Sequence, residues 1–330
     1  MEMTWIWVAF NVFVLGMLAL DLGVFHRKAH EVSIKEATIW SVVWIGLAMV
    51  FNVLIYYYWD VMNPANPQGY SNDEAALLFL TGYLIEKSLS VDNVFVFALV
   101  FSSFAVPAIY QHRVLFWGVL GALIMRGIMI AAGAALINEF HWIIWIFGGF
   151  LIYTGIKMFK SDHGAVDPQN HTVVRWLRKI MPMTDGYEQD RFVVVKNGVR
   201  MATPLFAVLL VIEFTDLIFA VDSIPAIFAV TLDPFIVYTS NVFAILGLRS
   251  LYFVLAGAMG KFRYLKPALA FILVFVGIKM FYPDVMYWLT AEKEKFPPLI
   301  SLAIVTTTLL VAIVASWWRN RQEPTASAQH

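Results

Sequence analysis

The stretch Glu86-Lys-Ser-Leu-Ser-Val-Asp92-Asn93 lies inside a long apolar run and carries three charged side chains where an α-helix would cross a membrane. Its pattern recurs as Asp216-Leu-Ile-Phe-Ala-Val-Asp222-Ser223, again an acid, five residues, an aspartate and a small polar residue. A charged side chain at the centre of a bilayer costs about 2.5–3.5 kcal/mol and faces the protein interior or a water-filled cavity. Both stretches are therefore the first candidates for a functional site.

The composition around these stretches indicates a membrane protein. The chain has 330 residues, of which 60% are hydrophobic and 14% charged, whereas a soluble domain has roughly a quarter charged. Apolar runs of about 18 residues or more, each able to cross about 30 Å of hydrocarbon, recur along the chain. We therefore predict an all-α polytopic membrane protein with the lipid bilayer as its solvent. The absence of cysteine excludes disulfides, thiolate metal sites and thiol catalysis.

Apolar windows predict about nine transmembrane helices. An odd number of spans places the two termini on opposite sides of the membrane. Lys and Arg gather on one face of this topology, and because such residues are retained in the cytoplasm, we predict a periplasmic N-terminus and a cytoplasmic C-terminus. The predicted helices lie near residues 4–23, 37–59, 75–102, 113–137, 141–159, 203–230, 235–259, 265–283 and 299–318.

The two acidic stretches each open a unit of three predicted helices, and the units resemble each other. Arg126 in the fourth helix matches Arg249 in the seventh, and Gly155-Ile-Lys-Met-Phe159 is repeated as Gly277-Ile-Lys-Met-Phe281. Because a unit has three spans, the second copy must cross the membrane in the opposite sense, as in many secondary transporters. We therefore predict that the middle six helices form two inverted three-helix repeats.

The predicted organisation follows from these repeats and from one soluble segment. The stretch Phe192–Arg200 predicts a small hairpin that turns at Asn197-Gly198. The segment around it is either a solvated connector or a cytoplasmic gate or partner site. The predicted units are two N-terminal helices in 1–74, repeat 1 in 75–159, the cytoplasmic loop in 160–202, repeat 2 in 203–283, and a C-terminal helix with a cytoplasmic tail in 284–330.

Five acids fall in the interior of predicted spans, and we expect them to bind a cation; Asp21 lies near the end of its span. Two of them lie near the midplane, and the second acid of each stretch lies roughly 9 Å further along its helix. Asn93 and Ser223 share a helix face with the midplane acids Glu86 and Asp216, respectively. We predict that the metal ligands are Glu86, Asp92, Asn93, Glu213, Asp216, Asp222 and Ser223, with Asp21 and Asn241 as weaker candidates.

Internal neutralisation is the alternative to a cation site. Lys87, Arg126 and Arg249 are the predicted counter-ions, but three cations leave an excess of two acids. Oxygen ligands suit hard cations, so Mn²⁺, Ca²⁺ and Mg²⁺ stay open while zinc and copper are poor candidates. Protons are a further candidate partner, because a released divalent ion leaves carboxylates that favour protonation. We expect no prosthetic group, and the formal charge of zero argues against a nucleic-acid partner.

Three stretches resemble the TerC family of integral membrane proteins, and within it the Alx-type branch. They are Gly82–Phe95, Phe219–Phe228 and Asn241–Ser250, and the resemblance extends over about residues 5–318. It implies a protein of the bacterial inner membrane that is linked to manganese export and metal homeostasis, with an association with tellurite resistance and alkaline stress. It also implies that the intramembrane acids form the metal site. The export direction and the preference for manganese come from the resemblance alone.

Three classes of function stay open. The first is a Mn²⁺ exporter that works by alternating access. The second is a non-transporting scaffold or sensor in the response to metal, tellurite or alkaline stress, with a partner at residues 160–202. The third, an intramembrane enzyme, is disfavoured, because Gly-x-Gly-Asp, Ser/His and His-x-x-x-His arrangements are absent from the predicted spans.

Overall fold

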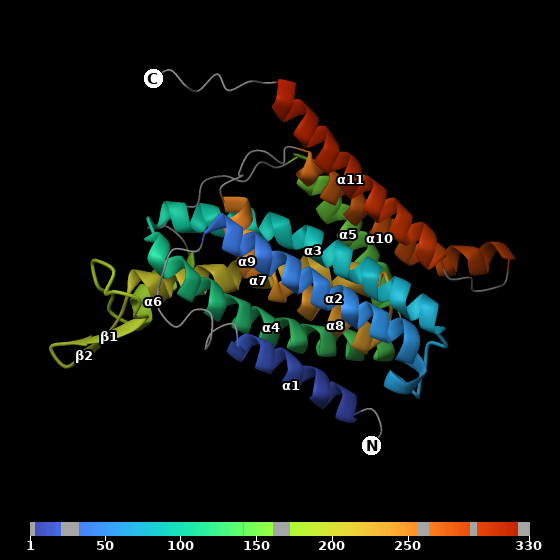
Figure 1. The fold of residues 1–330 in the computed structure, drawn as a ribbon, viewed down its shortest axis with the longest axis horizontal. Coiled ribbons are helices and arrows are strands. Elements are labelled where there is room, and N and C mark those ends of the chain that lie inside the picture. Colours follow the sequence, from blue (N-terminus) through green and yellow to red (C-terminus); the bar gives the residue numbers. More distant parts are fainter. Residues whose placement is uncertain are drawn as a thin grey trace.

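The computed structural model describes residues 4–20, 33–140, 142–160, 172–256, 264–290 and 296–322, without the side chains of Leu20, Asp92, Lys160, Asp222, Ala256, Asn320 and Gln322. These residues form a helix bundle with a two-stranded hairpin at one end (Figure 1). The elements are α1 (Thr4–Leu20), α2 (Ile34–Met62), α3 (Asn72–Ser103), α4 (Ala108–Glu139), α5 (Ile143–Lys160), α6 (Thr172–Ile180), β1 (Val193–Lys196), β2 (Val199–Ala202), α7 (Pro204–Phe228), α8 (Pro234–Leu246), α9 (Leu248–Ala256), α10 (Leu265–Thr290) and α11 (Pro298–Gln322).

Local sequence signals fix where the central helices begin. Glu74 accepts a hydrogen bond from the backbone N–H of Ser71 at 3.1 Å and completes a capping box at the start of α3. Thr203 precedes a proline and caps α7. Asp233 also precedes a proline and accepts hydrogen bonds from two backbone N–H groups of α8. These caps satisfy amide groups that the first turn of a helix leaves unpaired.

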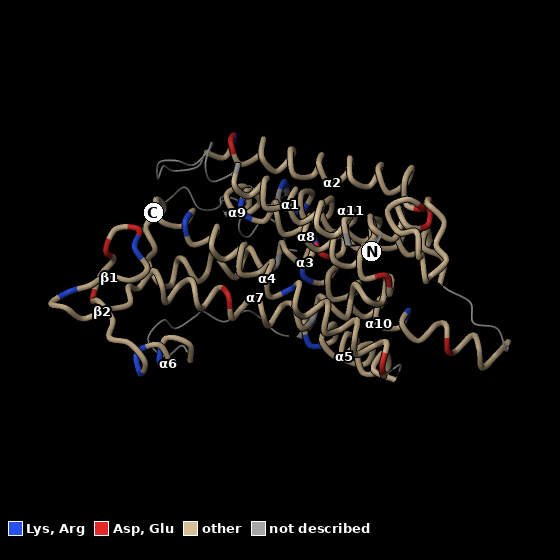
Figure 2. The backbone as a smooth tube through the Cα atoms, turned by 90° about the horizontal axis from the view of Figure 1, so that it is seen from below, with Lys and Arg blue, Asp and Glu red and all other residues tan. Residues whose placement is uncertain are grey.

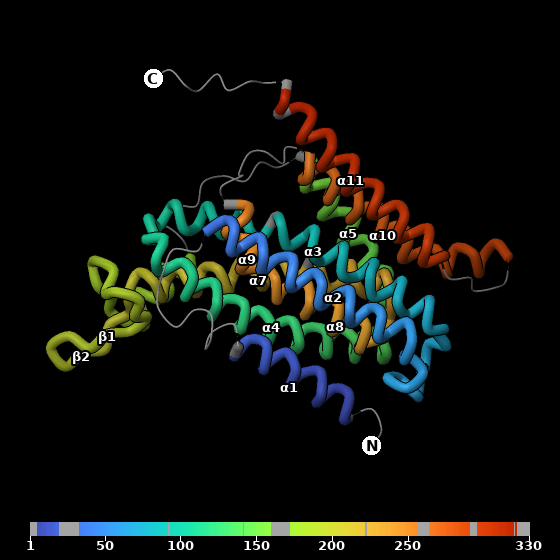
Figure 3. Tube along the Cα trace, in the orientation of Figure 1, coloured from blue at the N-terminus to red at the C-terminus, as the bar shows by residue number. Residues whose placement is uncertain are grey.

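The two predicted units pack on each other in a reciprocal way. Helix α3 packs on α8, α4 packs on α7, and α5 packs on α10. Helices α1 and α11 lie at opposite edges of the bundle, with α2 across its centre in this view (Figure 3). Ring contacts such as Phe10 with Phe243, at 5.8 Å between centroids, join α1 to α8. The first helix of each unit therefore packs on the second helix of the other, and the third helices pack on each other.

Glycines allow α5 and α10 to approach closely. A Cβ atom on Gly155 would lie 2.8 Å from the carbonyl oxygen of Ala270, and one on Gly277 would lie 2.8 Å from the carbonyl oxygen of Gly148. Small residues at such interfaces let helix backbones pack in lipid, where there is no hydrophobic force to drive association. The two glycines of the repeated motif thus have matching roles, although the inverted repeat itself stays a prediction.

Five described helices are long and apolar enough to cross a membrane, and α8 with α9 would be a sixth if the pair is one span. Helices α1 and α5 are apolar but shorter, and α3, with 32 residues, carries Glu86, Lys87 and Asp92 near its middle. The count of nine spans is therefore not confirmed. The helices that pass the test are α2, α4, α7, α10 and α11.

The predicted helix 235–259 is wrong as a single element. It breaks at Gly247 into α8 and α9, whose axes differ in direction by 41°. A Cβ atom on Gly247 would lie 2.7 Å from Lys87 Nζ and 3.2 Å from Trp44 Cβ, so two other helices occupy the space beside this residue. The break therefore depends on packing between helices, and the apolar run in the sequence did not predict it.

The described part of the segment between α5 and α7 contains a short helix and a hairpin. Strands β1 and β2 pair antiparallel around the predicted Asn197-Gly198 turn, where both residues have positive φ. Helix α6 was not predicted. Tyr187 donates a hydrogen bond at 2.7 Å to the carbonyl oxygen of Phe104, at the end of α3, and burial raises the pKa of Tyr187 to about 12. The phenol therefore stays a donor at neutral pH and ties the segment to the bundle.

Gly277→Ala should lower the thermal unfolding midpoint of the detergent-solubilised protein. The added methyl group would meet the backbone of α5, and such overpacking costs on the order of 1–3 kcal/mol. Gly149→Ala is the matched control, because no atom lies within 4 Å of its added Cβ. That variant should keep the midpoint or raise it slightly, since alanine favours a helix over glycine by about 1 kcal/mol. Equal midpoints for the two variants would contradict the close packing.

Candidate cation site

Arg126, in the middle of α4, is the centre of a buried polar cluster and is only 2% exposed. It contacts Glu86 and donates to both carboxylate oxygens of Asp216, from Nη2 at 3.2 Å and from Nε at 3.4 Å. Five oxygen atoms of four side chains surround the guanidinium, which we call the oxygen cage: Glu86 Oε1, Asp216 Oδ1 and Oδ2, Ser223 Oγ at 3.4 Å and Asn241 Oδ1 at 3.1 Å.

The residues of the oxygen cage come from three helices other than α4. Glu86 comes from α3, Asp216 and Ser223 come from α7, and Asn241 comes from α8. Residues seven apart lie on one face of a helix, so α7 presents both of its ligands to the same point. Asn93, seven residues after Glu86, donates a hydrogen bond at 3.4 Å to Asp216 Oδ1 and supports the cage from α3.

The cage has more negative than positive charge among its described groups. Glu86 and Asp216 are 0% and 2% exposed, and Arg126 is the cation that contacts both of them. The second oxygen of Glu86, Oε2, is buried and has no hydrogen-bond partner. A buried carboxylate oxygen without a partner is costly, because nothing replaces the water it has lost. The cluster is therefore not a fully satisfied structural network.

The other predicted residues lie outside the cage. Lys87 Nζ donates to the carbonyl oxygen of Ala244 at 3.1 Å, near the break between α8 and α9, and does not hydrogen-bond to the cage acids. Arg249 Nη1 lies 3.0 Å from His112 Nε2. Glu213 is half-buried one turn before Asp216, and its carboxylate lies against the bare α-carbon of Gly121 on α4.

Three predicted ligands cannot be placed: Asp21 lies outside the described residues, and so do the side chains of Asp92 and Asp222. Among the described side chains, no three Asp, Glu, His or Cys residues gather closely enough to hold a metal ion. The oxygen cage is closed around Arg126 instead. A cation can therefore use these oxygens only if the guanidinium moves away.

A crevice of about 440 Å³ borders the cage at Ser223. It lies between α3, α5, α7 and α10. Asn93 and Ser223 line it at the level of the cage, and Lys157 and Lys266 line it at the ends of α5 and α10. Val221 also lines the crevice, so the residues immediately before and after Asp222 both border it. The crevice thus borders one polar residue of each acidic stretch, Asn93 and Ser223.

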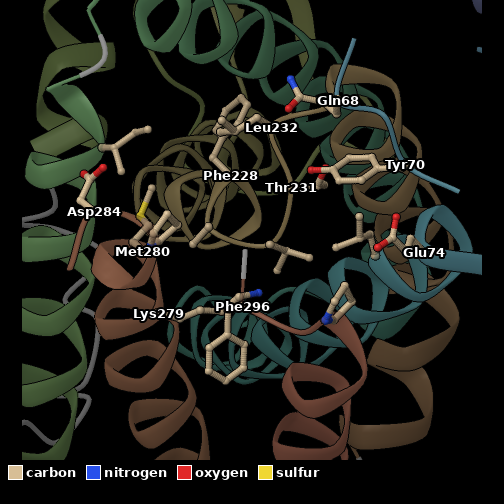
Figure 4. A pocket seen from close by; sticks show the side chains of 16 residues that line it. Gln68, Tyr70, Glu74, Phe228, Thr231, Leu232, Lys279, Met280, Asp284 and Phe296 are labelled. Atoms are coloured by element: carbon tan, nitrogen blue, oxygen red, sulfur yellow. The ribbon is translucent and has the colours of Figure 1, made fainter. Parts of the chain in front are cut away.

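A second cavity, of about 310 Å³, lies toward the opposite ends of α3, α7 and α10 (Figure 4). Glu74, Tyr70 and Asp284 line it, but none of the cage residues does. Lys279 is 8% exposed, donates to Ser301 Oγ at 3.2 Å and lies 5.8 Å from the ring centroid of Phe296. The two lysines of the repeated Gly-Ile-Lys-Met-Phe motif, Lys157 and Lys279, thus line cavities that open toward opposite ends of the bundle.

Comparison with known proteins supports one family. Residues 71–324 match the family described as integral membrane protein TerC family, a range that includes every cage residue. The chain belongs to the TerC family. A membrane protein of Myxococcus xanthus is 51% identical over 98% of this chain and 95% of its own length. A protein of Escherichia coli K12 named as a membrane-bound redox modulator, Alx, is 48% identical over 96% of this chain and 95% of its own length. No solved structure matches this chain.

Arg126→Met should strongly lower the thermal unfolding midpoint of this TerC-family protein. It leaves two buried carboxylates without their counter-ion, and breaking such a pair costs about 3–5 kcal/mol. The triple variant Glu86→Gln, Arg126→Met, Asp216→Asn should recover most of the loss, because it also removes the unbalanced charges. Arg113→Met on the same helix is the control, since the Arg113–Asp190 pair is about two-fifths exposed and such pairs contribute about 0–1 kcal/mol. Similar midpoints for the two single arginine variants would refute the central role of Arg126.

Proposed function

We propose that this TerC-family protein exports a hard divalent cation, Mn²⁺ in the first place, across the bacterial inner membrane. The observation that carries the proposal is the oxygen cage. Carboxylate, amide and hydroxyl oxygens are the ligands that hard cations such as Mn²⁺, Ca²⁺ and Mg²⁺ prefer. Placing two carboxylates at membrane depth is costly, and ionisable groups at that depth mark ion pathways. Manganese and the outward direction follow from the family resemblance, which the oxygens alone do not distinguish.

Arg126 is proposed to alternate with the transported ion. With the guanidinium in place, Glu86, Asp216 and Arg126 carry a net charge of −1. If the guanidinium swings away, the two carboxylates leave a charge of −2, which one divalent cation neutralises. The ion would then approach through the crevice, past Asn93 and Ser223, and the guanidinium would return after the ion had left. Arg126 thus serves as a built-in cation that makes the empty site tolerable at membrane depth.

Alternating access fits the positions of the two cavities. Ser223 of the cage and its neighbour Asn93 line the crevice, whereas no cage residue lines the opposite cavity, which supports access to the cage from one end of the bundle. The crevice ends at the side on which Lys and Arg gather, which is the proposed cytoplasmic side. Rocking one three-helix unit against the other would open the cage toward the opposite cavity. A proton could accompany the return step by binding to a vacated carboxylate.

The name of the Escherichia coli relative points to redox modulation. This chain has no cysteine, so thiol–disulfide exchange is not open to its own side chains. A change in cytoplasmic metal content would give such an effect indirectly. The alternative of a non-transporting scaffold or sensor predicts no ion flux, tolerance of Asn and Gln at the intramembrane acids, and a requirement for residues 160–202.

Proteoliposomes that contain the purified parent protein should transport Mn²⁺, measured with a metal-sensitive dye trapped inside. Glu86→Gln and Asp216→Asn should each reduce the initial rate at least about tenfold, because each removes one of the charges that balance the ion. Asp92→Asn and Asp222→Asn should also impair transport. Asp60→Asn and Glu139→Gln, which change exposed acids at helix ends, should keep the parent rate. Parent-like rates in all four intramembrane variants would disprove the proposed site.

Arg126→Gln should separate exchange from net transport. Without the built-in cation, the ion-free site keeps two unbalanced carboxylates. The ion-free protein should therefore switch back to its starting conformation slowly. Exchange of internal for external Mn²⁺ needs no empty return and should persist, whereas net flux into metal-free buffer should fall at least about tenfold. Arg126→Lys should restore part of the net flux, because it restores the positive charge. Equal losses of exchange and net flux, in amounts of folded protein matched to the parent, would refute the alternation.

A further inference from the structure

Helix α6 (Thr172–Ile180) has two chemically different halves. At about 100° per residue, its cations Arg175, Arg178 and Lys179 fall on one half of the helix and its apolar side chains on the other. The helix contains no acid. A short helix with basic residues on one side and Trp or other apolar residues on the other is typical of a segment that lies in the membrane interface. The apolar half consists of Val173, Val174, Trp176, Leu177 and Ile180.

The bundle covers only part of this apolar half. Val174 and Leu177 are 2% and 4% exposed and belong to the hydrophobic core, where α6 packs on α7. Trp176 and Ile180, one turn apart on the same half, are 59% and 60% exposed. Two large apolar side chains therefore face outward next to the side that the protein covers.

The place of α6 at the end of the bundle fits the level of a membrane interface. Helix α6 lies beside the end of the bundle, while β1 and β2 reach further out (Figures 1 and 2). It contacts α7, which begins at Pro204 after the hairpin. Trp residues are enriched where spans meet the headgroup region, and Trp176 has an exposed ring at this level.

The cations of α6 are not neutralised within the described chain. Arg175, Arg178 and Lys179 are all exposed, and none of them forms an ion pair with a described residue. Asp185 lines the same recess as Arg178 but does not form a salt bridge with it. Three positive charges next to uncovered Trp and Ile side chains are complementary to a surface that offers both negative headgroups and hydrocarbon.

We propose that α6 is an interfacial helix that binds the headgroups of anionic phospholipids in the leaflet at this end of the bundle. Trp176 and Ile180 enter the boundary of the acyl chains, and the three cations contact lipid phosphates. This assignment rests on the membrane fold and not on the proposed ion transport. An acidic protein partner would neutralise the cations, but it would not cover the exposed apolar side chains of Trp176 and Ile180. A membrane surface does both.

Binding at α6 would also hold the start of α7 in place. The chain after α6 bonds to β2, because Ala202 N–H donates to the carbonyl oxygen of Pro182 at 2.8 Å and Thr184 N–H donates to the carbonyl oxygen of Ala202 at 2.9 Å. Strand β2 leads through Thr203, the cap of α7, into the helix that carries Asp216. The lipid surface is thus connected through a short, hydrogen-bonded path to a helix of the oxygen cage.

Because the chain lacks cysteine, a single introduced cysteine can carry one fluorescent reporter in the full-length protein. We would label Ile180→Cys with bimane and reconstitute it with phospholipids brominated near the headgroup. Val195→Cys on β1 is the matched control, since both native side chains are apolar and exposed, at 60% and 65%. The reporter at position 180 should be quenched by brominated lipid and protected from aqueous iodide. The reporter at position 195 should show the reverse.

The choice of headgroup is tested by brominating either phosphatidylglycerol or phosphatidylcholine in mixed vesicles. Quenching at position 180 should favour the anionic lipid, and Arg175→Gln and Lys179→Gln should each reduce this preference by about fivefold, the effect of one basic residue near a charged surface. Iodide quenching at position 180 with no lipid quenching would overturn the proposal. Lipid quenching with equal preference for both headgroups would overturn the anionic part of it. Transport of Mn²⁺ enters neither readout, so the two proposals fail independently.

Discussion

The attraction between one guanidinium and two buried carboxylates is the constraint on which the rest of this structure depends. Arg126 on α4 contacts Glu86 on α3 and Asp216 on α7, and all three are at most 2% exposed. At membrane depth no water replaces a lost partner, so separating these helices would leave charges in a medium that cannot solvate them. The close contacts elsewhere, such as Gly277 against the backbone of α5, keep the bundle tight enough to hold this arrangement.

The same cluster lacks the complete pairing of buried polar atoms and charges that is expected of a purely structural ion pair. A structural ion pair should satisfy every buried polar atom, yet Glu86 Oε2 has no hydrogen-bond partner and the described charges do not cancel. Asn241 and Ser223 add neutral oxygens around the guanidinium, which makes the cage resemble the shell that a hard cation requires. The remaining negative charge fits the proposed exchange of the internal cation for a divalent one.

Much of the fold and part of the candidate site could be predicted because the relevant signals are local. Apolar runs indicate helices in lipid wherever they occur, and the Asn197-Gly198 turn is set by the two residues at its centre. Helical periodicity places Ser223 on the face of Asp216, and the structure directs both toward Arg126. The nine-residue helix α6 escaped detection because it is shorter than any window that identifies a span.

By itself, the sequence determined that this TerC-family chain is a helical membrane protein with acids at membrane depth. Only the tertiary structure decided which cation neutralises them. Lys87 adjoins Glu86 in sequence, but neighbouring residues point about 100° apart on a helix, and Lys87 turns to the carbonyl oxygen of Ala244. Arg126, forty residues away, is the cation that contacts Glu86 instead, because α4 packs on α7 and α8 and both of these helices pack on α3. Periodicity fixes direction around a single helix, whereas the choice of partner depends on distances between helices that no local pattern encodes.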